Sequence, residues 1–111
     1  MTENAFRTAR LLKILGNPLR YKIIAALRGG PLCSSEIAVH ARRPLHAVSR
    51  ALTHLGLAGL VCYRTAGRSV VYSLKHDDIR SVLDRVESFV RAHELPAGSG
   101  MGCGRPAGND Q

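Results

Sequence analysis

The chain has few acidic side chains, and they are unevenly spread. Eight Asp and Glu stand against sixteen Lys and Arg, which gives a formal net charge of +8. Residues 1–70 contain 11 basic and 2 acidic side chains, whereas residues 71–111 contain 5 basic and 6 acidic ones. Thirteen of the cations are arginine, which suits bidentate contacts to phosphate and guanine. A GC-rich genome also favours arginine, but it does not explain the segregation, so residues 1–70 are a candidate for binding nucleic acid.

The chain also lacks several features that mark other classes of protein. No apolar run is long enough to cross a bilayer, and residues 1–10 lack the apolar core of a secretory signal. Cys33, Cys62 and Cys103 are an odd number of cysteines with no close pair, which argues against a disulfide framework. The five histidines are scattered, without a Ser-His-Asp or Cys-His grouping. We therefore expect a cytoplasmic protein that has no membrane partner and is not an enzyme.

Apolar residues recur at helical spacing in five parts of the chain. This spacing predicts helices over residues 5–15, 18–28, 34–41, 44–55 and 77–93. Asn17 suits the N-cap of the second helix, and Pro18 suits its first position. At the third helix we expect Ser34 or Ser35 to be the cap, with Glu36 near the positive end of the helix.

Two runs rich in Val and Tyr, residues 60–65 and 69–74, predict a β-hairpin. Gly67 in its turn is able to adopt a positive φ, and arginine lies at its tip. The expected fold class is therefore mainly α with a small β-hairpin. Its order of elements is typical of a winged helix-turn-helix domain, here over residues 1–95. Residues 96–111 are rich in Gly and Pro and predict a disordered tail.

The helix expected over residues 44–55 has two unlike faces. One face is an apolar stripe that we expect to be buried, formed by Leu45, Val48, Leu52 and Leu55. Because the second helix of a helix-turn-helix lies in the major groove, we expect the other face to contact DNA. The expected DNA contacts are Arg42, Arg43, His46, Ala47, Ser49, Arg50, Thr53, Arg64 and Arg68. Arg50 is the candidate for reading guanine directly, and an ordinary solvated helix face is the alternative.

The segments LGNPLRYKII, HAVSRALTHLGLAGLV and GRSVVYSL together resemble the ArsR/SmtB family of metal-responsive transcriptional regulators. The resemblance implies a homodimer built on the first and last helices, and a repressor that binds a palindromic double-stranded DNA operator. The apolar stripe of the last helix also favours a homodimer, although both helices could instead close the core of one chain. The chain departs from the family at Arg42 and Arg43 in the turn, at Pro44 and at His46.

The resemblance suggests two ligand sites, of which the first uses thiols. Members that sense arsenic carry LCVCDL at the third helix, where this chain has LCSSEI. Cys33 matches the first thiol, but Ser35 stands in place of the second. Because soft metalloids favour about three thiolates, such a site would use Cys33 with Cys103. The alternative is that Cys33 only fills space and that Cys103 has no role, while Cys62 is expected to pack within its strand.

The second site lies in the last helix and uses nitrogen and oxygen ligands. Zinc-sensing members carry Asp-x-His and His-x-x-Glu or His-x-x-His pairs there. His76 and Asp78 supply the first pair in swapped order, and His93 and Glu94 lie one residue beyond the second. This set favours a divalent metal ion (Ni, Co or Zn) as effector, bound across the dimer. Helix capping by His76 and Asp78, a thiol-based metalloid or redox sensor, and a regulator without a ligand are the alternatives.

Overall fold

The computed structural model describes residues 2–98. The chain divides into two compact units, Met1–Arg80 and Ser81–Gln111. The elements are α1 (Glu3–Leu15), α2 (Pro18–Leu27), β1 (Leu32–Cys33), α3 (Ser34–Ala41), α4 (Leu45–Leu57), β2 (Val61–Ala66), β3 (Ser69–Leu74) and α5 (Ile79–Ala92). Most of the tail expected over residues 96–111, including Cys103, lies outside the described residues.

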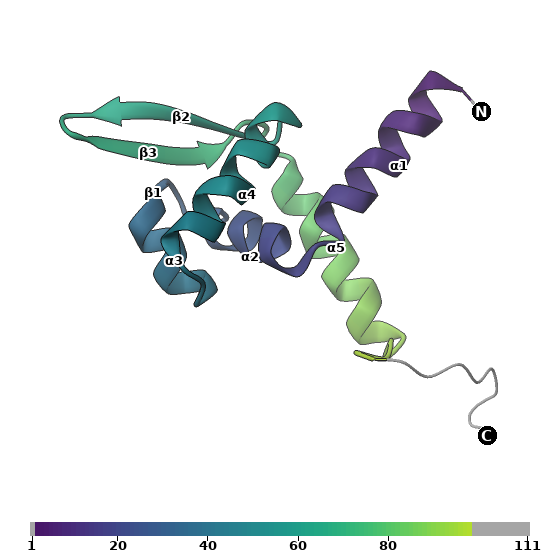
Figure 1. The fold of residues 1–111 in the computed structure, drawn as a ribbon. Helices are drawn as coiled ribbons and strands as arrows, with labels where there is room; N and C mark the ends of the chain where they lie inside the picture. Colours follow the sequence, from purple (N-terminus) through teal and green to yellow (C-terminus); the bar gives the residue numbers. More distant parts are fainter. Residues whose placement is uncertain (1, 99–111) are drawn as a thin grey trace. The chain divides into compact units, whose positions relative to one another are not determined.

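The order of helices and the hairpin confirm the predicted winged helix-turn-helix arrangement (Figure 1). The short strand β1 was not expected. It pairs antiparallel with β3, so the sheet has three strands in the order β1-β3-β2. A strand of two residues is too short to produce a periodic pattern, which is why the sequence alone predicts only a hairpin.

The core of the first unit lies between α2, α3 and α4. Ile23, Ile24 and Leu27 of α2 are fully buried or nearly so, and Ile37 of α3 is completely buried. Further buried side chains come from α4 and β2: Val48, Ala51, Leu52, Leu55 and Val61. Three of the four residues of the expected α4 stripe therefore pack as predicted, and they fix the opposite face of α4 toward solvent.

Leu45 is the exception in that stripe, because it is 49% exposed rather than buried. It is the first residue of α4 and follows the turn at Pro44. Because α4 has no turn before Leu45, no preceding helical side chain covers it. The prediction that Leu45 is buried was therefore wrong, at the end of the helix where apolar spacing is least informative. Leu45 instead adds an apolar side chain to the exposed surface at the N-terminus of α4.

The start of α2 agrees with the sequence. Asn17 has an extended backbone, and its Oδ1 accepts a hydrogen bond from the backbone N–H of Arg20 at 3.0 Å. Pro18 occupies the first helical position, where its missing N–H removes no helical hydrogen bond. Both expectations for this helix start are confirmed.

The start of α3 differs from the prediction, because Cys33 is its N-cap and Ser34 is already helical. The Cys33 N–H donates to a carboxylate oxygen of Glu36 at 2.9 Å. This hydrogen bond lowers the pKa of the Glu36 carboxyl. Cys33 is held extended because it pairs with Val71 of β3, so the helix begins only after that pairing ends.

The hairpin closes tightly. Ala66 pairs with Ser69, so Gly67 and Arg68 form the two-residue loop between β2 and β3. Gly67 has a φ of 64°, which confirms that glycine serves a backbone conformation unfavourable for other residues. Arg68 is therefore at the tip of the hairpin, as the sequence predicts.

The first and last helices leave large apolar side chains exposed. In α1 no residue is buried, and Phe6 and Leu12 are each 63% exposed. In α5, Ile79 and Leu83 are buried, but four apolar side chains of the expected stripe are 40–57% exposed: Val82, Val86, Phe89 and Val90. These four side chains recur at helical spacing and form one apolar face of α5.

Candidate nucleic-acid interface

The turn between α3 and α4 is built from three residues. Arg42 ends α3 in the left-handed conformation, with φ 56° and ψ 44°. Its N–H donates to the carbonyl of Val39 at 3.3 Å, and the N–H of Arg43 donates to the carbonyl of Ala38 at 3.2 Å. Pro44 is the N-cap of α4 but supplies no side-chain hydrogen bond. Two arginines therefore lie directly before the first turn of α4.

The DNA-contact residues expected in and around α4 reach the surface. Arg42, Arg43, His46, Ser49, Arg50 and Thr53 are exposed, and Ala47 is half-buried. The Thr53 hydroxyl donates to the carbonyl of Ser49 at 3.1 Å, so its proton is engaged by the helix and its oxygen is left as an acceptor. The remaining polar groups on this face are available to an external partner.

Arg64 and Arg68 are exposed on the hairpin. Side chains alternate along a strand, so Arg64 lies on the face that carries Cys62, opposite the face that carries Tyr63. Arg68 lies in the loop. The hairpin thus carries cations on one face and at its tip.

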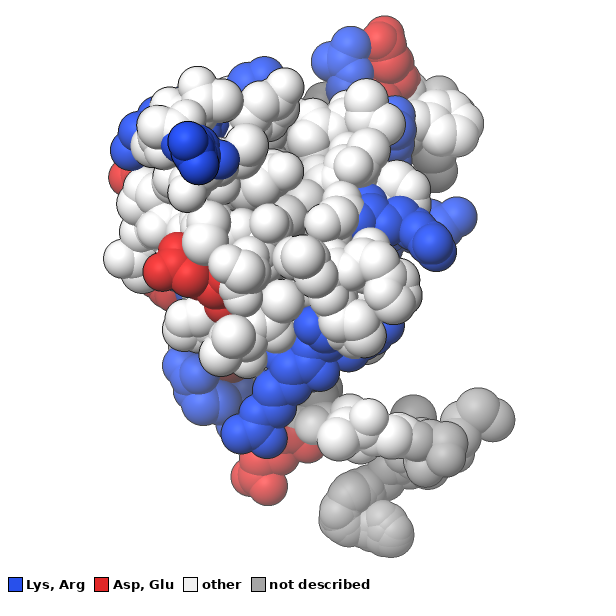
Figure 2. Space-filling model, turned by 60° about the vertical axis from the view of Figure 1, so that its left-hand side comes forward, with Lys and Arg blue, Asp and Glu red and all other residues white. Residues whose placement is uncertain are grey.

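No acidic residue interrupts this part of the chain. Between Glu36 and Asp77 the sequence contains no Asp or Glu, and this stretch includes all of α4 and the hairpin. On the face drawn in Figure 2, Lys and Arg are more abundant than Asp and Glu. The acidic side chains in that view come from other segments, and α4 and the hairpin, whose charged side chains are all basic, suit an anionic partner.

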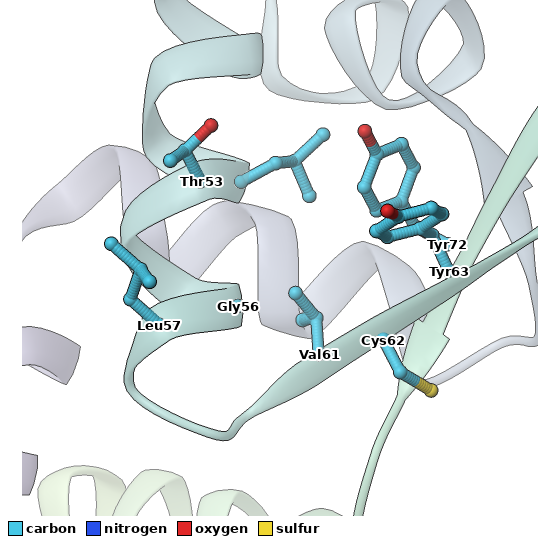
Figure 3. A pocket seen from close by; sticks show the side chains of 8 residues that line it. Thr53, Gly56, Leu57, Val61, Cys62, Tyr63 and Tyr72 are labelled. Carbon is cyan, nitrogen blue, oxygen red and sulfur yellow. The ribbon is translucent and has the colours of Figure 1, made fainter.

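A groove separates α4 from the hairpin (Figure 3). Its volume is about 420 Å³, and its lining includes Leu52 and Leu57 from α4 and Val61 from β2. Tyr63 and Tyr72 are paired across the two strands, with ring centroids 5.9 Å apart and planes tilted by 50°. This aromatic pair stiffens the hairpin beside α4. Sequence reasoning missed it, although the register of the hairpin, once assumed, would have found it.

The candidate metal ligands occupy the two ends of α5. His76 and Asp78 are exposed in the turn before the helix, and His93 and Glu94 are exposed after it. The His93 ring lies against Phe89, with centroids 4.5 Å apart. In the part of the chain that the structure describes, no group of three or more His, Cys, Asp or Glu side chains is suited to hold a metal ion.

The candidate thiol site is seen only in part. Cys33 is half-buried, and its Sγ lies 3.1 Å from the hydroxyl of Ser35. Cys103 lies outside the described residues. Cys62 is exposed, with its Sγ 3.5 Å from the Ser73 hydroxyl, so the expectation that it packs within the sheet was wrong. The alternation of strand residues turns Cys62 away from the buried Val61.

Known proteins share the sequence pattern and the fold of this chain. No family model matches the chain. It is 37% identical over 97 residues to the HTH-type transcriptional regulator NmtR of Mycobacterium tuberculosis, covering 87% of this chain and 79% of that protein. It is 31% identical over 89 residues to the transcriptional repressor SmtB homolog of Synechocystis sp., covering 80% and 67%.

Among solved structures, the fold matches the homodimeric winged helix-turn-helix DNA-binding domain of a possible ArsR-family transcriptional regulator from Mycobacterium bovis. The TM-score is 0.74 at 24% identity, over 92% of this chain and 97% of that one. The chain is therefore a transcriptional regulator of the winged helix-turn-helix type, which is not an enzyme class. It belongs to the ArsR/SmtB family. No helix in residues 2–98 has the length and apolar character that a membrane span requires.

Proposed function

We propose that this chain binds a double-stranded DNA operator as a homodimer, with α4 in the major groove, and that it thereby represses transcription in the cytoplasm. We further propose that a divalent metal ion bound at the ends of α5 modulates this binding. The observation that carries the DNA proposal is the exposed face of α4, which is flanked by arginines on two elements and free of carboxylates.

The residues on the exposed face of α4 are suited to different parts of the DNA. Arg50 is our candidate for direct readout, because its guanidinium fork matches the two acceptors of guanine in the major groove. His46, Ser49 and Thr53 lie on the same exposed face and suit base edges or nearby sugar and phosphate. Ala47 is small enough for close approach to the groove.

The flanking arginines suit the phosphate backbone. Arg42 and Arg43 precede α4, where the positive end of the helix dipole adds to their charge. Arg64 and Arg68 extend from the hairpin. Such contacts neutralise phosphates without reading sequence, so they supply affinity and orientation.

The exposed apolar side chains of α1 and α5 support the homodimer. Phe6 and Leu12 on α1, and Val86 and Phe89 on α5, are all more than half exposed in one chain. Soluble proteins rarely leave such a stripe uncovered unless it meets a partner. A symmetric dimer also gives the two copies of α4 that a palindromic operator requires.

The donor chemistry at the ends of α5 supports a divalent ion. His76 and His93 offer imidazole nitrogen, and Asp78 and Glu94 offer carboxylate oxygen. This mixture suits Ni, Co or Zn and does not suit arsenic, which favours thiolates. Because the described residues of one chain assemble no group of three donors, we propose that a second copy completes the ligand set.

Metal and DNA binding would be linked through the dimer. An ion that joins residues from two copies favours the dimer arrangement in which those residues are close. If that arrangement spaces the two α4 helices wrongly for the operator, the ion lowers DNA affinity. The size of this effect is limited by the difference in ion affinity between the two arrangements.

A thiol sensor is the second candidate, and one observation favours it. Cys33 is the N-cap of α3 and is only half-buried, so its thiol is open to a reagent from solvent. Cys33 lies at the junction of β1 and α3 and pairs with Val71 of β3, the second strand of the hairpin. A metalloid or oxidant that reacts with Cys33, with Cys103 as the proposed second thiol, would therefore act on the sheet that carries the hairpin.

The DNA proposal is tested by binding to the promoter DNA of the chain's own operon over a range of salt concentrations. If Arg42, Arg43, Arg64 and Arg68 each neutralise one phosphate in both subunits, the logarithm of affinity should fall against that of salt with a slope of about −7. Light scattering on the same sample should give the mass of a dimer. A monomer that ignores duplex DNA at low salt would refute the proposal.

The effector is tested by titrating Ni, Co, Zn and As(III) with and without that DNA. Replacing His76 and Asp78 together by Ala should abolish the response to divalent metals and leave DNA affinity unchanged without metal. Replacing Cys33 and Cys103 by Ser is the matched variant, which should abolish only a response to As(III) or oxidants. A metal response that survives the first pair of substitutions would remove these two residues from the site.

A further inference from the structure

A second basic surface lies between α4 and α2, on the side of α4 away from the groove beside the hairpin. A cavity of about 180 Å³ opens there between α2, the turn before α4, and α4 itself. Its cationic and imidazole side chains define what we call the α2-side cluster: Arg20, Arg43, Arg50 and His54. None of these four groups is matched by an acidic residue in the lining of the cavity, which is otherwise formed by Asn17, Leu19, Ala47 and Ala51.

A neighbouring cavity continues the positive surface toward α1. It has a volume of about 320 Å³ and shares Arg20 and His54 with the first cavity. Its two further cations, Arg10 and Lys13, come from α1. Among the described residues that line this cavity there is again no Asp or Glu, so basic side chains from three helices surround a hollow without a protein counter-ion.

One side-chain contact within the cluster joins α2 to α4. One terminal nitrogen of the Arg20 guanidinium, Nη2, lies 3.1 Å from Nδ1 of His54. Because a guanidinium only donates, Nδ1 of His54 is the acceptor. This contact holds Arg20, which starts on α2, against α4 and still leaves further guanidinium N–H groups for a ligand.

Position along α4 connects the cluster to the DNA-facing surface. Ala47, Arg50 and His54 are separated by three and four residues, so they form one row along the helix. The groove beside the hairpin is lined by a different row, which includes Leu52 and Gly56. The hairpin and the α2-side cluster therefore flank the exposed face of α4 on its two sides.

We infer that the α2-side cluster, through Arg20, binds a backbone phosphate of the DNA, on the edge of the major groove away from the hairpin. The inference rests on the proposed function, because it takes α4 to lie in the groove. A helix about 10 Å across nearly fills a groove about 12 Å wide, so both flanks of the helix meet a phosphate backbone. Guanidinium groups suit the oxygens of a phosphodiester, and the N-terminus of α2 at Asn17 adds partial positive charge.

This inference assigns functions to Arg20 and His54, neither of which is among the DNA contacts expected from the sequence. Arg20 contacts the phosphate, and His54 is a positioning residue that holds the Arg20 guanidinium through the 3.1 Å contact. Arg10 and Lys13 extend the same track along the backbone. Arg50 lies between the base edges and this track, and Arg20 does not, so Arg20 is the residue that tests the inference.

The test compares Arg20→Ala with Lys22→Ala on two duplexes, the promoter DNA and a scrambled duplex of the same composition. Lys22 is an exposed cation on the same helix that lines neither cavity. Arg20→Ala should weaken binding to both duplexes about tenfold and make the salt slope of the dimer shallower by about 2. Lys22→Ala should leave the slope unchanged. Both variants retain the cap of α2, because Asn17 accepts from the backbone N–H of Arg20.

Two further measurements address the assignment of the ligand and of His54. Replacing single phosphates of the promoter duplex by uncharged methylphosphonates should reveal one position per half-site that weakens the wild type but not Arg20→Ala. His54→Ala should reduce the slope less than Arg20→Ala, and the double variant should match Arg20→Ala alone, as expected for a residue that acts through another. Inorganic pyrophosphate, titrated without DNA, serves as the free-phosphate probe.

The outcomes separate the inference from the proposed function. If the wild type binds the promoter and Arg20→Ala matches Lys22→Ala in affinity and slope, the phosphate assignment is wrong and the proposed function stands. If pyrophosphate binds in an Arg20-dependent way while DNA affinity does not depend on Arg20, the cluster serves a free phosphorylated ligand and the assignment to DNA is overturned. If the wild type binds no duplex at low salt, both proposals fail.

Discussion

Replacing Arg42 by glycine should raise the stability of the protein and lower its affinity for DNA. Arg42 ends α3 with φ 56° and ψ 44°, in the left-handed region. This conformation costs a residue with a side chain about 1–2 kcal/mol. Glycine adopts this conformation freely. However, glycine gives the unfolded chain more conformational freedom, and losing that freedom on folding costs about 0.5–1 kcal/mol. The net gain in the free energy of unfolding should therefore be about 0.5–1 kcal/mol.

The assay is thermal unfolding at one fixed protein concentration, because the stability of a dimer depends on concentration. For a domain of this size each kcal/mol shifts Tm by about 4–8 °C, so Arg42→Gly should raise Tm by roughly 2–8 °C. On the proposed DNA surface the same change removes one phosphate contact per subunit. The salt slope of the dimer should become shallower by about 2.

Two control variants isolate the backbone from the charge. Arg42→Ala removes the charge but keeps a side chain in the left-handed conformation, so it should lower DNA affinity without raising Tm. Arg43 does not have a positive φ, and Arg43→Gly should lower both Tm and DNA affinity. If Arg42→Gly destabilises the protein as much as Arg43→Gly does, the reasoning from the backbone conformation is refuted.

Three further predictions concern a cap, a carboxylate and the dimer. Asn17→Ala removes the side-chain cap of α2 and should cost about 1 kcal/mol in chemical unfolding; an unchanged midpoint would show that water replaces the cap. Glu36 has a lowered pKa because it accepts from the Cys33 N–H, so it stabilises the fold at neutral pH and this contribution is lost as pH falls through the lowered pKa. The stability difference between wild type and Glu36→Gln should therefore shrink on acidification, and a difference independent of pH would contradict it. Phe89→Asp should yield monomers by light scattering and Ser88→Asp should not; equal masses for both variants would exclude that face of α5 from the interface.

The sequence predicts the order of the elements because residues typical of helix starts and turns separate segments with a clear apolar periodicity. Asn17 and Pro18 mark a helix start by known hydrogen-bonding preferences, and Gly67 marks a turn that needs a positive φ. Cysteine is not a preferred cap, so nothing at Cys33 signals the start of α3. That start depends on pairing with β3, nearly forty residues later in the chain, which local patterns do not encode.

The candidate site was predictable to the extent that it lies on one helix. Helical spacing alone separates Ser49 and Arg50 from the buried Val48 and Leu52. The contact between Arg20 and His54 joins residues 34 positions apart, and only the packing of α2 against α4 brings them together. Contacts of this kind depend on tertiary structure and leave no pattern in a single sequence.

The pairing of β1 with β3 has a consequence for redesigning the specificity of such regulators. Leu32 and Cys33 belong to the same sheet as the hairpin, yet Cys33 also starts α3. A chimera that imports only residues 61–74 from a relative would place a foreign strand beside the native Leu32–Cys33 segment. A grafted hairpin should therefore be exchanged together with Leu32 and Cys33. The structural unit to exchange is the three-stranded sheet, whose strands are not contiguous in the sequence.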